Sequence, residues 1–514
     1  MKLFIQHPVH FNPCNPGLYN EARFVSPNSL GTAIRNDQQL EKSMFLGRKE
    51  ELSELENLYQ IKKSSLIVIY GRRRIGKSSL IHEFCKNKHS FTFEGLEGEK
   101  TPAQIKHFCQ LLQEQFADPM LHDTKFNSWQ AVFAYMTLKI SENNKIILFF
   151  DEFQWIAAGQ SKLVSLIKYF WDNEWKQKNV MLILCGSIAS FMINKVIKSK
   201  ALYGRINLEM NLKGLKSFEA FEMLRRKRSI DETMRYLLTL GNVPKYLEEI
   251  DLSKSFEQNI ERLCFNSKGV MVREFDRIFY NQFREAKNYL AIIKYIKDKI
   301  RSKKEISENV KIKSGGGLKL YLDNLEMAGF VKSYVPFGHN KNSKLKKYRL
   351  SDTYLSFYFE YIEPNIESII DYDIKGIFQA RIKSSMNIWL GFSFERFCLN
   401  NANIISRIMG FESQVTGISP YFGRKNEKFQ IDLIYTRSDK VITICEIKFQ
   451  MGEIGTKVIP EIERKCKLIK IPKGFTIEKA LISRFGPCNS LRDADYFHHY
   501  VSVDDMFDEN WYRK

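Results

Sequence analysis

The chain has 514 residues, of which 44% are hydrophobic and 27% are charged. This length exceeds what one core supports and indicates about three domains of ordinary globular composition. The nine cysteines form no C-x-x-C pair, which argues against a disulfide framework or a zinc cluster. No apolar run approaches bilayer-spanning length, and the N-terminus lacks the pattern of a signal peptide. We therefore expect a cytoplasmic protein without a membrane partner.

The charge balance suggests what the protein binds. There are 79 Lys and Arg residues against 59 Asp and Glu residues, which gives a formal net charge of +20. Such an excess favours a polyanionic partner, most often a nucleic acid. The alternative is that the basic composition only reflects a lysine-rich proteome. We expect DNA as the partner.

The first 43 residues are rich in Asn, Pro and Gly and lack a sustained hydrophobic period. We interpret them as a loose extension. Met44 directly precedes Phe45-Leu46-Gly47-Arg48, where ordered protein is expected to begin. A misassigned start codon is therefore a hypothesis for this end of the chain.

From Gly47 to Leu212, helical and strand-like segments alternate, as an α/β fold requires. Hydrophobic periodicity predicts helices over 50–59, 79–84, 105–116 and 129–140. It predicts strands over 66–70, 91–93, 146–150 and 180–185. Residues 217–280 are expected to be mostly helical.

The segment Gly71-Arg-Arg-Arg-Ile-Gly-Lys-Ser78 fits the phosphate-binding pattern G-x-x-x-x-G-K-[ST] directly after an expected strand. The glycines would let backbone N–H groups surround the phosphates at the positive end of the following helix. Lys77 would reach the β- and γ-phosphates of ATP, and Ser78 would hold Mg²⁺. The alternative, an accidental Gly-rich turn, is not favoured by the flanking apolar residues. The residues expected to bind ATP here are Gly71, Arg72, Arg73, Arg74, Ile75, Gly76, Lys77, Ser78 and Ser79.

Two carboxylates, Asp151 and Glu152, follow the expected strand at 146–150. Asp151 would support the Mg²⁺ shell through Ser78 or water, and Glu152 would polarise the attacking water. The next strand ends in Gly186-Ser187. Ser187 either lies between the carboxylates and senses the γ-phosphate, or is the N-cap of a helix over 188–193.

Arg205, in Leu202-Tyr-Gly-Arg205, is a candidate for stabilising negative charge on the transferred phosphate. It would act in its own subunit or, in a homo-oligomer, in the site of a neighbouring copy. The alternative is an ordinary surface ion pair.

Five motifs in this part of the chain resemble the archaeal-type ATPase family, within the AAA+/STAND group of P-loop ATPases. The resemblance spans residues 44–280 and implies an ATPase core with a helical lid. It also implies that Arg48 and the segment 241–247 lie near the adenine. Ser78 stands where the family often has Thr, and Asn242 where it often has a second Gly. The motifs are Phe45-Leu-Gly-Arg-Lys-Glu-Glu-Leu52, Tyr70-Gly-Arg-Arg-Arg-Ile-Gly-Lys-Ser78, Phe149-Phe-Asp-Glu-Phe-Gln154, Cys185-Gly-Ser187 and Gly241-Asn-Val-Pro-Lys-Tyr-Leu247.

Residues 285–350 combine helical segments with a polar hairpin, the outline of a winged helix-turn-helix. Leu318, Leu322 and Leu325 fall on one helix face, and the segments 331–337 and 346–350 are expected to pair as strands. Residues 285–365 also resemble the unit that follows this ATPase core.

Lysines are concentrated on the same unit. Contacts between them and phosphates would give salt-sensitive, largely sequence-independent binding to DNA. The alternative is a solvated basic face on a winged helix that serves only as a spacer. The lysines are Lys303, Lys304, Lys311, Lys313, Lys319, Lys341, Lys344, Lys346 and Lys347.

Two strand-like segments near the C-terminus carry Asp432 and the pair Glu446 and Lys448. Residues two apart in a strand share a face, so Glu446 and Lys448 point the same way. A turn at 437–440 would bring Asp432 near Glu446. Carboxylate oxygens suit Mg²⁺, and an adjacent lysine can orient or deprotonate a hydrolytic water. Glu395, on a preceding helix, would add a third carboxylate to this metal site.

This spacing resembles the PD-(D/E)xK nuclease core, and residues 385–480 resemble the nuclease-related domain often fused to archaeal-type ATPases. Ile431 replaces the usual Pro before the first Asp. Two alternatives remain, an inactive descendant that keeps only the fold and a structural salt bridge. Lys457 and Lys465, on the following segment, are expected either to contact DNA or to be solvated surface.

The sequence thus predicts an α/β, P-loop AAA+-like ATPase with a helical lid, a winged helix-turn-helix and a C-terminal restriction-endonuclease-like α/β domain. We expect it to hydrolyse ATP and to cleave DNA with Mg²⁺ under the control of ATP. The alternative is a STAND-like switch, in which ATP sets the oligomeric state and the C-terminal domain binds nucleic acid or protein without cleaving. The expected boundaries are 1–43 for the extension, 44–212 for the ATPase core, 213–284 for the lid, 285–365 for the winged helix and 366–514 for the nuclease-like domain.

Overall fold

The computed structural model describes most of the chain from Phe45 onward, a part that belongs to one unit, Phe45–Lys514. The extension predicted over 1–43 and the proposed start at Met44 lie outside the described residues. So do Lys313 and Lys341 of the predicted basic surface. The described ranges are 45–116, 126–140, 144–158, 162–224, 227–280, 282–283, 286–312, 315–340, 343–423 and 427–513.

The first sheet is entirely parallel, with the strand order β2-β3-β4-β1-β5. Its strands are β1 (Ser65–Tyr70), β2 (Ser90–Glu94), β3 (Ile146–Asp151), β4 (Val180–Gly186) and β5 (Ile206–Asn211). Strand β4 lies between β1 and β3. Because the three strands are parallel, their carboxyl ends meet at one edge of the sheet. This edge is where a parallel sheet presents binding residues.

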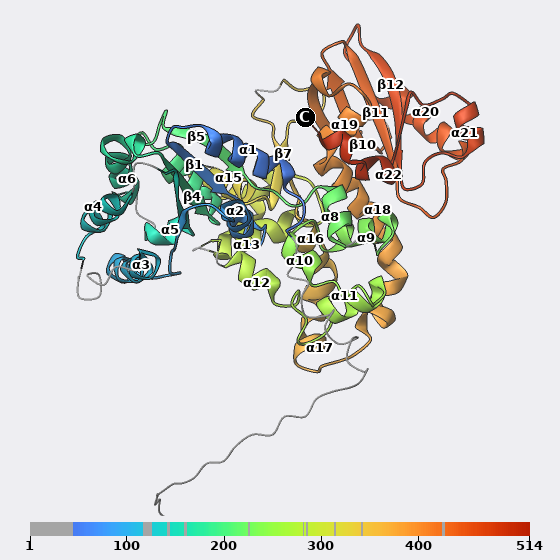
Figure 1. Cartoon of the computed structure of the whole chain (residues 1–514). Coiled ribbons are helices and arrows are strands. Elements are labelled where there is room, and N and C mark those ends of the chain that lie inside the picture. Colours follow the sequence, from blue (N-terminus) through green and yellow to red (C-terminus); the bar gives the residue numbers. More distant parts are fainter. Residues whose placement is uncertain are drawn as a thin grey trace, which may run out of the picture. The chain divides into compact units, whose positions relative to one another are not determined.

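Helices cover both faces of this sheet (Figure 1). Successive strand residues point to opposite faces, so Ile67 and Ile69 pack with α1 and α2, whereas Leu66 and Val68 pack with α3 to α6. The helices are α1 (Lys49–Gln60), α2 (Lys77–Cys85), α3 (Thr101–Phe116), α4 (Trp129–Lys139), α5 (Phe153–Ile156), α6 (Lys162–Asn173) and α7 (Ala189–Phe191).

The middle of the chain is mostly helical, as predicted. It begins with α8 (Ser217–Met223), α9 (Ile230–Thr239), α10 (Pro244–Glu248), α11 (Phe256–Cys264) and α12 (Glu274–Phe279). A helix-hairpin unit over 286–350 follows, with α13 (Ala286–Ile296), β6 (Arg301–Ser302), α14 (Lys303–Val310), α15 (Gly316–Met327), β7 (Val331–Tyr334) and β8 (Lys347–Leu350). Leu318, Leu322 and Leu325 are fully buried, and β7 pairs antiparallel with β8. The expected helix face and hairpin are therefore present.

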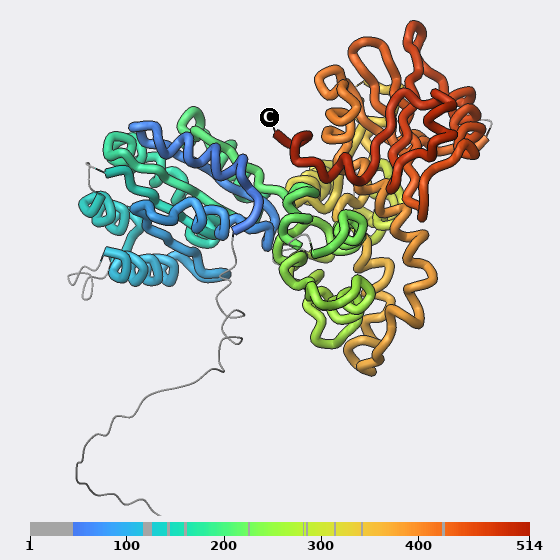
Figure 2. The backbone as a smooth tube through the Cα atoms, turned by 45° about the vertical axis from the view of Figure 1, so that its right-hand side comes forward, coloured from blue at the N-terminus to red at the C-terminus, as the bar shows by residue number. Residues whose placement is uncertain are grey.

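The C-terminal part contains a second five-stranded sheet, ordered β13-β12-β11-β10-β9. Its strands are β9 (Val415–Gly423), β10 (Phe429–Arg437), β11 (Val441–Lys448), β12 (Thr476–Ser483) and β13 (His499–Ser502). Strands β9 to β11 are antiparallel, and β11 to β13 are parallel. The helices are α16 (Thr353–Phe357), α17 (Ile366–Ile370), α18 (Lys383–Asn400), α19 (Ala402–Ile408), α20 (Ile459–Leu468), α21 (Asn489–Asp493) and α22 (Val503–Phe507). Figure 2 traces this part in orange and red.

Part of the hydrophobic core extends across the expected domain boundaries, whereas the side chains packed around Leu66 and Val68 form a separate cluster within the ATPase core. One cluster of buried side chains includes Ile183 on β4, Leu237 on α9, Leu322 on α15, Phe394 on α18 and Leu433 on β10. Because protein interiors are densely packed, a structural change in one of these elements shifts the elements that pack against it. Within the described ranges, no helix is both long and apolar enough to cross a membrane.

Candidate functional site

The phosphate-binding loop connects β1 to α2 at the carboxyl edge of the first sheet. Gly76 caps α2 with a φ of 87°, a conformation that glycine adopts without strain. A Cβ on Gly71 would lie only 2.3 Å from the carbonyl oxygen of Leu212. Both glycines are therefore required by the backbone path, as the motif predicts.

Replacing Gly71 by Ala is expected to lower the free energy of unfolding by about 1–3 kcal/mol, because the added Cβ overpacks the loop against Leu212. Nucleotide affinity should fall as well. Thermal unfolding with and without ATP measures both effects. Gly317→Ala is the matched control, since a Cβ there meets nothing within 4 Å. Equal melting temperatures for the two variants would contradict this packing.

The lysine of the phosphate-binding loop, Lys77, is buried. The Lys77 side chain is 5% exposed, and its Nζ donates a hydrogen bond to the carbonyl oxygen of Arg72 (3.1 Å). Ser78 follows on the first turn of α2. The loop is thus closed on itself in a form that can receive phosphate oxygens at the helix N-terminus.

The two expected carboxylates lie at the end of β3. Asp151 is 6% exposed, and its Oδ1 accepts a hydrogen bond from the N–H of Glu152 (2.8 Å). Within the described ranges no lysine or arginine pairs with Asp151. Burial raises the pKa of the Cys185 thiol on β4, and Asp151 and Glu152 raise it further while Lys77 lowers it. All three charged groups therefore lie near the Cys185 thiol at the end of β4.

Ser187 contacts the second carboxylate directly. Its hydroxyl donates to Oε2 of Glu152 (2.7 Å), and the amide of Gln154 donates to the same oxygen. The N-cap of α7 is Ile188, so the N-cap interpretation of Ser187 is wrong. Gln154 was not singled out from the sequence, although it belongs to the same motif as Glu152.

The three arginines of the loop each face an acid. Arg72 pairs with Asp352, Arg73 with Glu97 (2.9 Å) and Arg74 with Glu274 (2.7 Å). Burial opposes the charged form of Arg72, yet Asp352, Tyr246 and Glu274 together outweigh it and raise the pKa of the guanidinium. Glu274 is fully buried, and burial raises the pKa of its carboxyl.

Tyr246 completes this network. Its hydroxyl donates to Oε1 of Glu274 (2.9 Å) and accepts from Nη2 of Arg72 (3.3 Å). Pro244 lies 3.8 Å from the position of a Cβ on Gly76. The segment 241–247 therefore lies against the phosphate-binding loop, and the carboxylates of Glu274 and Asp352 reach it from later parts of the chain.

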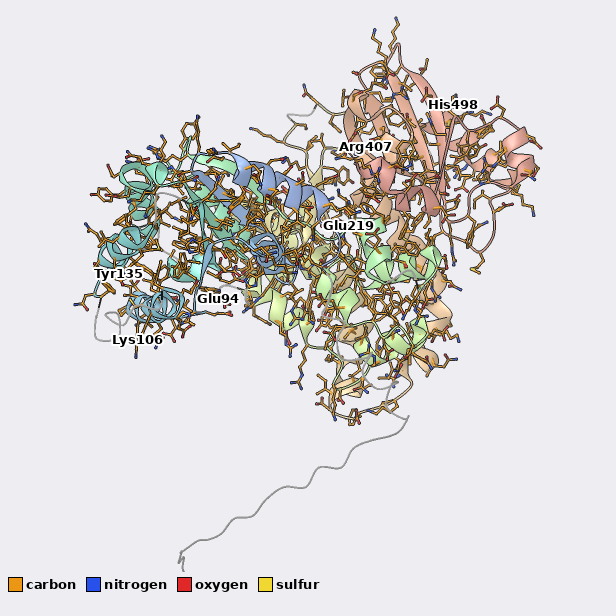
Figure 3. The ribbon with its side chains drawn as sticks, in the orientation of Figure 1. Glu94, Lys106, Tyr135, Glu219, Arg407 and His498 are labelled. Atoms are coloured by element: carbon orange, nitrogen blue, oxygen red, sulfur yellow. The ribbon has the colours of Figure 1, made fainter. Side chains whose placement is uncertain are left out.

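Arg48 stabilises the backbone of the phosphate-binding loop through hydrogen bonds. It has a φ of 60° at the start of α1, and its guanidinium donates to the carbonyl oxygens of Ile75 (3.2 Å) and Lys213. Its backbone N–H donates to Glu219 on α8 (2.6 Å), a residue labelled in Figure 3. These contacts assign Arg48 a positioning role, and its proximity to adenine stays a prediction.

Arg205 does not join the other site residues. It directly precedes β5 and forms a two-pronged ion pair with Asp172 at the end of α6 (2.7 and 2.9 Å). The hydrogen bonds from Arg205 lower the pKa of Asp172 to about 2. A six-residue strand separates this edge from the phosphate-binding edge by about 20 Å. Arg205 therefore cannot act within its own subunit, and its action on a neighbouring copy stays a prediction.

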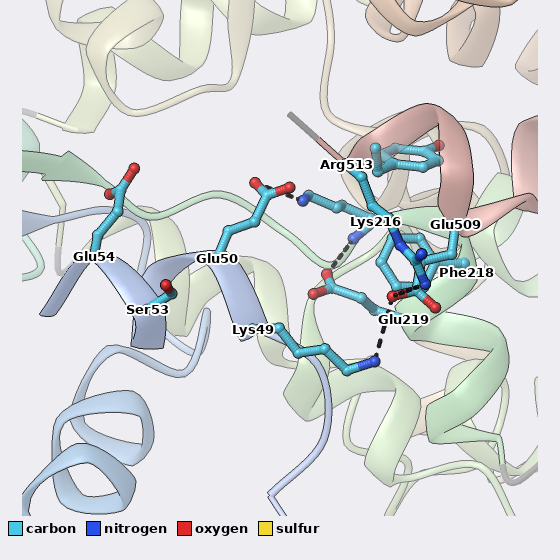
Figure 4. Close-up of a pocket in the computed structure, with 10 residues that line it drawn as sticks. Lys49, Glu50, Ser53, Glu54, Lys216, Phe218, Glu219, Glu509 and Arg513 are labelled. Atoms are coloured by element: carbon cyan, nitrogen blue, oxygen red, sulfur yellow. Dashed lines mark hydrogen bonds and ion pairs between the residues drawn. The ribbon is translucent and has the colours of Figure 1, made fainter. Parts of the chain in front are cut away.

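A pocket of about 530 Å³ lies beside α1, α8 and the last residues of the chain (Figure 4). Two ion pairs cross its lining, Lys49 with Glu509 (3.3 Å) and Lys216 with Glu50 (2.8 Å). This pocket is separate from the phosphate-binding loop.

The C-terminal carboxylates converge as the strand pattern predicts. Leu433 pairs with Cys445 in the β10–β11 ladder, which places Asp432 beside Glu446. Oδ2 of Asp432 accepts the N–H of Ile447 (3.2 Å), and Nε2 of Gln430 lies 3.0 Å from Oδ1 of Asp432 and 3.4 Å from Oε2 of Glu395.

The third carboxylate, that of Glu446, forms ion pairs with two lysines. The Oε1 atom of Glu446 lies 2.7 Å from Nζ of Lys448, and its Oε2 lies 2.6 Å from Nζ of Lys465. Lys465 is 5% exposed, so the expectation that it contacts DNA or solvent is wrong. Across the described residues, no three His, Cys, Asp or Glu side chains are arranged to hold a metal ion. The metal site predicted from Asp432, Glu446 and Glu395 is therefore not preformed.

The charges of this cluster predict a dependence of stability on pH. Burial, followed by the neighbouring carboxylates, raises the pKa of Glu395 to about 7 and that of Asp432 to about 6. Because the folded state binds these protons more tightly than the unfolded state, the stabilisation is complete below about pH 4 and is lost as pH rises to about 7. The expected loss is on the order of 1–3 kcal/mol.

Thermal unfolding in EDTA across this pH window measures the loss. The double variant Glu395→Gln/Asp432→Asn should flatten the dependence, because neither replacement titrates. An unchanged slope in that variant would show that other groups cause it.

Two protein families match segments of the chain. Residues 45–250 match an ATPase domain found predominantly in Archaea, and residues 358–459 match a family of archaeal and bacterial proteins of unknown function, DUF234. An uncharacterised protein of Methanocaldococcus jannaschii is 28% identical over 431 residues, which cover 83% of this chain and 92% of the relative. An uncharacterised ATP-binding protein of the same organism is 53% identical over 45 residues, 9% of this chain and 76% of the relative.

Solved structures are similar at low sequence identity. The Walker-type ATPase of Pyrococcus abyssi has a TM-score of 0.45 at 20% identity, over 62% of this chain and 96% of that one. The ORC2 protein of Aeropyrum pernix has a TM-score of 0.40 at 14% identity, over 65% and 97%. The family matches and the loop geometry lead to one conclusion. The chain contains an ATPase domain of the predominantly archaeal type followed by a DUF234 domain, and the protein is an ATPase.

Proposed function

We propose that the protein acts on DNA and that its C-terminal domain is a Mg²⁺-dependent nuclease of the PD-(D/E)xK kind, controlled by ATP. The observation that carries this proposal is the convergence of Glu395 on α18, Asp432 on β10, and Glu446 with Lys448 on β11. An acidic pair beside a lysine is the arrangement that metal-assisted phosphodiester hydrolysis needs.

In the ATPase domain, the proposed roles follow from the contacts at the strand ends. Lys77 and the backbone N–H groups of the loop would bind the phosphates, and Ser78 with the Asp151 carboxylate offers the hard oxygens that suit Mg²⁺. Glu152, oriented by Ser187 and Gln154, would accept a proton from the attacking water.

In the C-terminal domain, Asp432, Glu395 and Glu446 would hold Mg²⁺, which would supply Lewis acidity to the scissile phosphate. The raised pKa values of Asp432 and Glu395 fit such a site, since a cation would relieve the repulsion that contributes to them. Glu446 would have to exchange at least one lysine for the ion. Lys448 would then be free to orient the hydrolytic water.

The contacts between the loop and Glu274 and Asp352 support control by ATP. Arg72 and Arg74 are the loop's links to these two carboxylates. A triphosphate bound in the loop would compete with the carboxylates for the arginines. We propose that this competition loosens the links and rearranges the helix-hairpin unit over 286–350 and the domain beyond it.

We propose that the 286–350 unit is a winged helix that binds DNA phosphates through its exposed lysines, among them Lys304, Lys319 and Lys346. A gel-shift series on duplex DNA should show affinity falling steeply as salt rises. The triple Gln variant of these lysines should have a shallower salt slope, by about one unit for each phosphate that the variant no longer neutralises. Affinity that does not respond to salt would contradict phosphate binding.

One observation favours a second function, a STAND-like switch that binds without cleaving. Both oxygens of Glu446 are paired with lysines, which is also the arrangement of a structural ion-pair network. Plasmid nicking with Mg²⁺ separates the two functions. If the C-terminal domain is a nuclease, wild type nicks the plasmid and Glu446→Ala/Lys448→Ala does not. If the protein is a switch, neither protein nicks the plasmid.

A further inference from the structure

A cavity of about 940 Å³ lies between the 286–350 unit and the C-terminal sheet. Its lining runs from Arg301 and Arg349 of that unit to Phe392 and Glu395 on α18 and Asp432 on β10. Two of the carboxylates of the proposed nuclease site therefore face the same space as the hairpin of the preceding unit.

The cavity wall contains a guanidinium with unmatched charge. Arg349 is 8% exposed; its Nη2 donates to the side-chain oxygen of Asn400 (2.8 Å), and its buried Nη1 has no partner among the residues that the structure describes. Burial, followed by repulsion from Arg396, lowers the pKa of Arg349 to about 10. In the described ranges neither arginine forms an ion pair with an acid, and Nη1 of Arg396 also lacks a partner.

Burying Arg349 without an ion-pair partner is costly, and an anion bound in the cavity that Arg349 and Arg396 both line would lower that cost. Phosphate is the anion that a guanidinium fork recognises with two parallel bonds. The arginines thus give the cavity a site for a phosphate group close to Glu395 and Asp432.

Aromatic side chains face the same cavity and remain exposed. Phe392 is 61% exposed and Phe422 is 41% exposed, unusual values for phenylalanine. Phe392 lies one turn before Glu395 and Arg396 on α18. The ring of Phe337 in the hairpin loop contacts Tyr421 on β9 edge to face (5.9 Å), so aromatic side chains continue across both parts of the cavity.

We propose that this cavity binds single-stranded DNA, with a phosphate held by Arg349 and Arg396 and a base stacked on Phe392. The volume of the cavity is in the range of small-ligand sites, which suits one nucleotide of a single strand. Aromatic stacking beside cations is how proteins hold single strands. The proposal rests on the proposed nuclease function for its choice of DNA, and it specifies an unpaired or splayed strand as the substrate.

Binding is tested with full-length protein in EDTA, so that cleavage plays no part. Fluorescence anisotropy compares a labelled oligothymidine with a blunt duplex. Phe392→Ala should weaken oligothymidine binding about tenfold and leave duplex binding unchanged, because the base no longer has a ring to stack on. Ile388→Ala is the matched control, since Ile388 is 68% exposed on the same helix and does not line the cavity. Equal oligothymidine affinity for the two variants overturns the proposal.

Arg349→Gln should also weaken oligothymidine binding about tenfold or more, and Arg349→Lys should restore part of it. Unchanged ATP hydrolysis in both variants shows that they are folded. If thymidine monophosphate alone binds as tightly as the oligonucleotide, the cavity is a nucleotide site and the proposal is overturned. If oligothymidine binding depends on Arg349 but the protein does not nick plasmid DNA, this inference stands and the nuclease function is overturned. If the protein nicks plasmid DNA but Arg349→Gln binds oligothymidine as tightly as wild type, the nuclease function stands and this inference is overturned.

Discussion

Replacing Glu152 by Gln should lower the rate of ATP hydrolysis by about 10²–10⁴-fold while ATP still binds. The carboxylate stands at the end of β3, oriented by Ser187 and Gln154, where it would accept a proton from water. The amide keeps the size and most of the hydrogen bonding but cannot accept that proton. Phosphate release measures turnover, and equilibrium binding of a labelled ATP measures affinity.

Ser187→Ala is the informative comparison. It removes the hydroxyl hydrogen bond to Glu152 but leaves the carboxylate and its hydrogen bonds from Gln154 and the Ser187 backbone N–H, so its hydrolysis rate should lie between those of wild type and Glu152→Gln. If Glu152→Gln hydrolyses ATP at the wild-type rate, another group is the base. If it fails to bind ATP, the residue supports the fold of the loop and not the chemical step.

The second large effect concerns Asp432. Asp432→Asn should lower Mg²⁺-dependent plasmid nicking by about 10²–10³-fold, because the neutral amide removes one anionic oxygen ligand of the proposed metal and its charge. The rate of conversion of supercoiled to open-circular DNA, measured across a Mg²⁺ titration, gives both the rate and the apparent metal affinity.

Asp439→Asn on the same hairpin is the matched control. Asp439 forms an ion pair with Arg437 at the turn and takes no part in the carboxylate cluster. Its nicking rate should equal that of wild type. Equal losses in Asp432→Asn and Asp439→Asn would mean that the hairpin, and not the metal site, is being disturbed.

Local patterns were sufficient to predict the phosphate-binding loop and its carboxylates. Spacing fixes the position of Lys77 relative to the glycines, and the apolar strand fixes where Asp151 lies. The same reasoning succeeded for Glu446 and Lys448, because the two-residue period of a strand determines their shared face.

The long-range partners could not be predicted in this way. Asp352 lies 280 residues from Arg72 in the sequence, and no local period encodes that contact. The sequence predicted that Lys465 contacts DNA or solvent, yet this lysine is buried against Glu446, a contact that no local pattern encodes. Strand β5 was also missed. It is a sheet-edge strand with Met210 as its one buried residue, so it lacks the apolar run that identifies β3 and β4.

Plasmid nicking in Mg²⁺, with and without ATP, tests the central claim most directly. Wild type should nick only when ATP is present, and Lys77→Ala should not nick in either condition, because its loop cannot hold the triphosphate that releases Arg72 and Arg74. Glu446→Ala/Lys448→Ala should hydrolyse ATP normally and fail to nick. Nicking by Lys77→Ala at the wild-type rate would contradict control by ATP. The absence of nicking by wild type under every condition would contradict the nuclease.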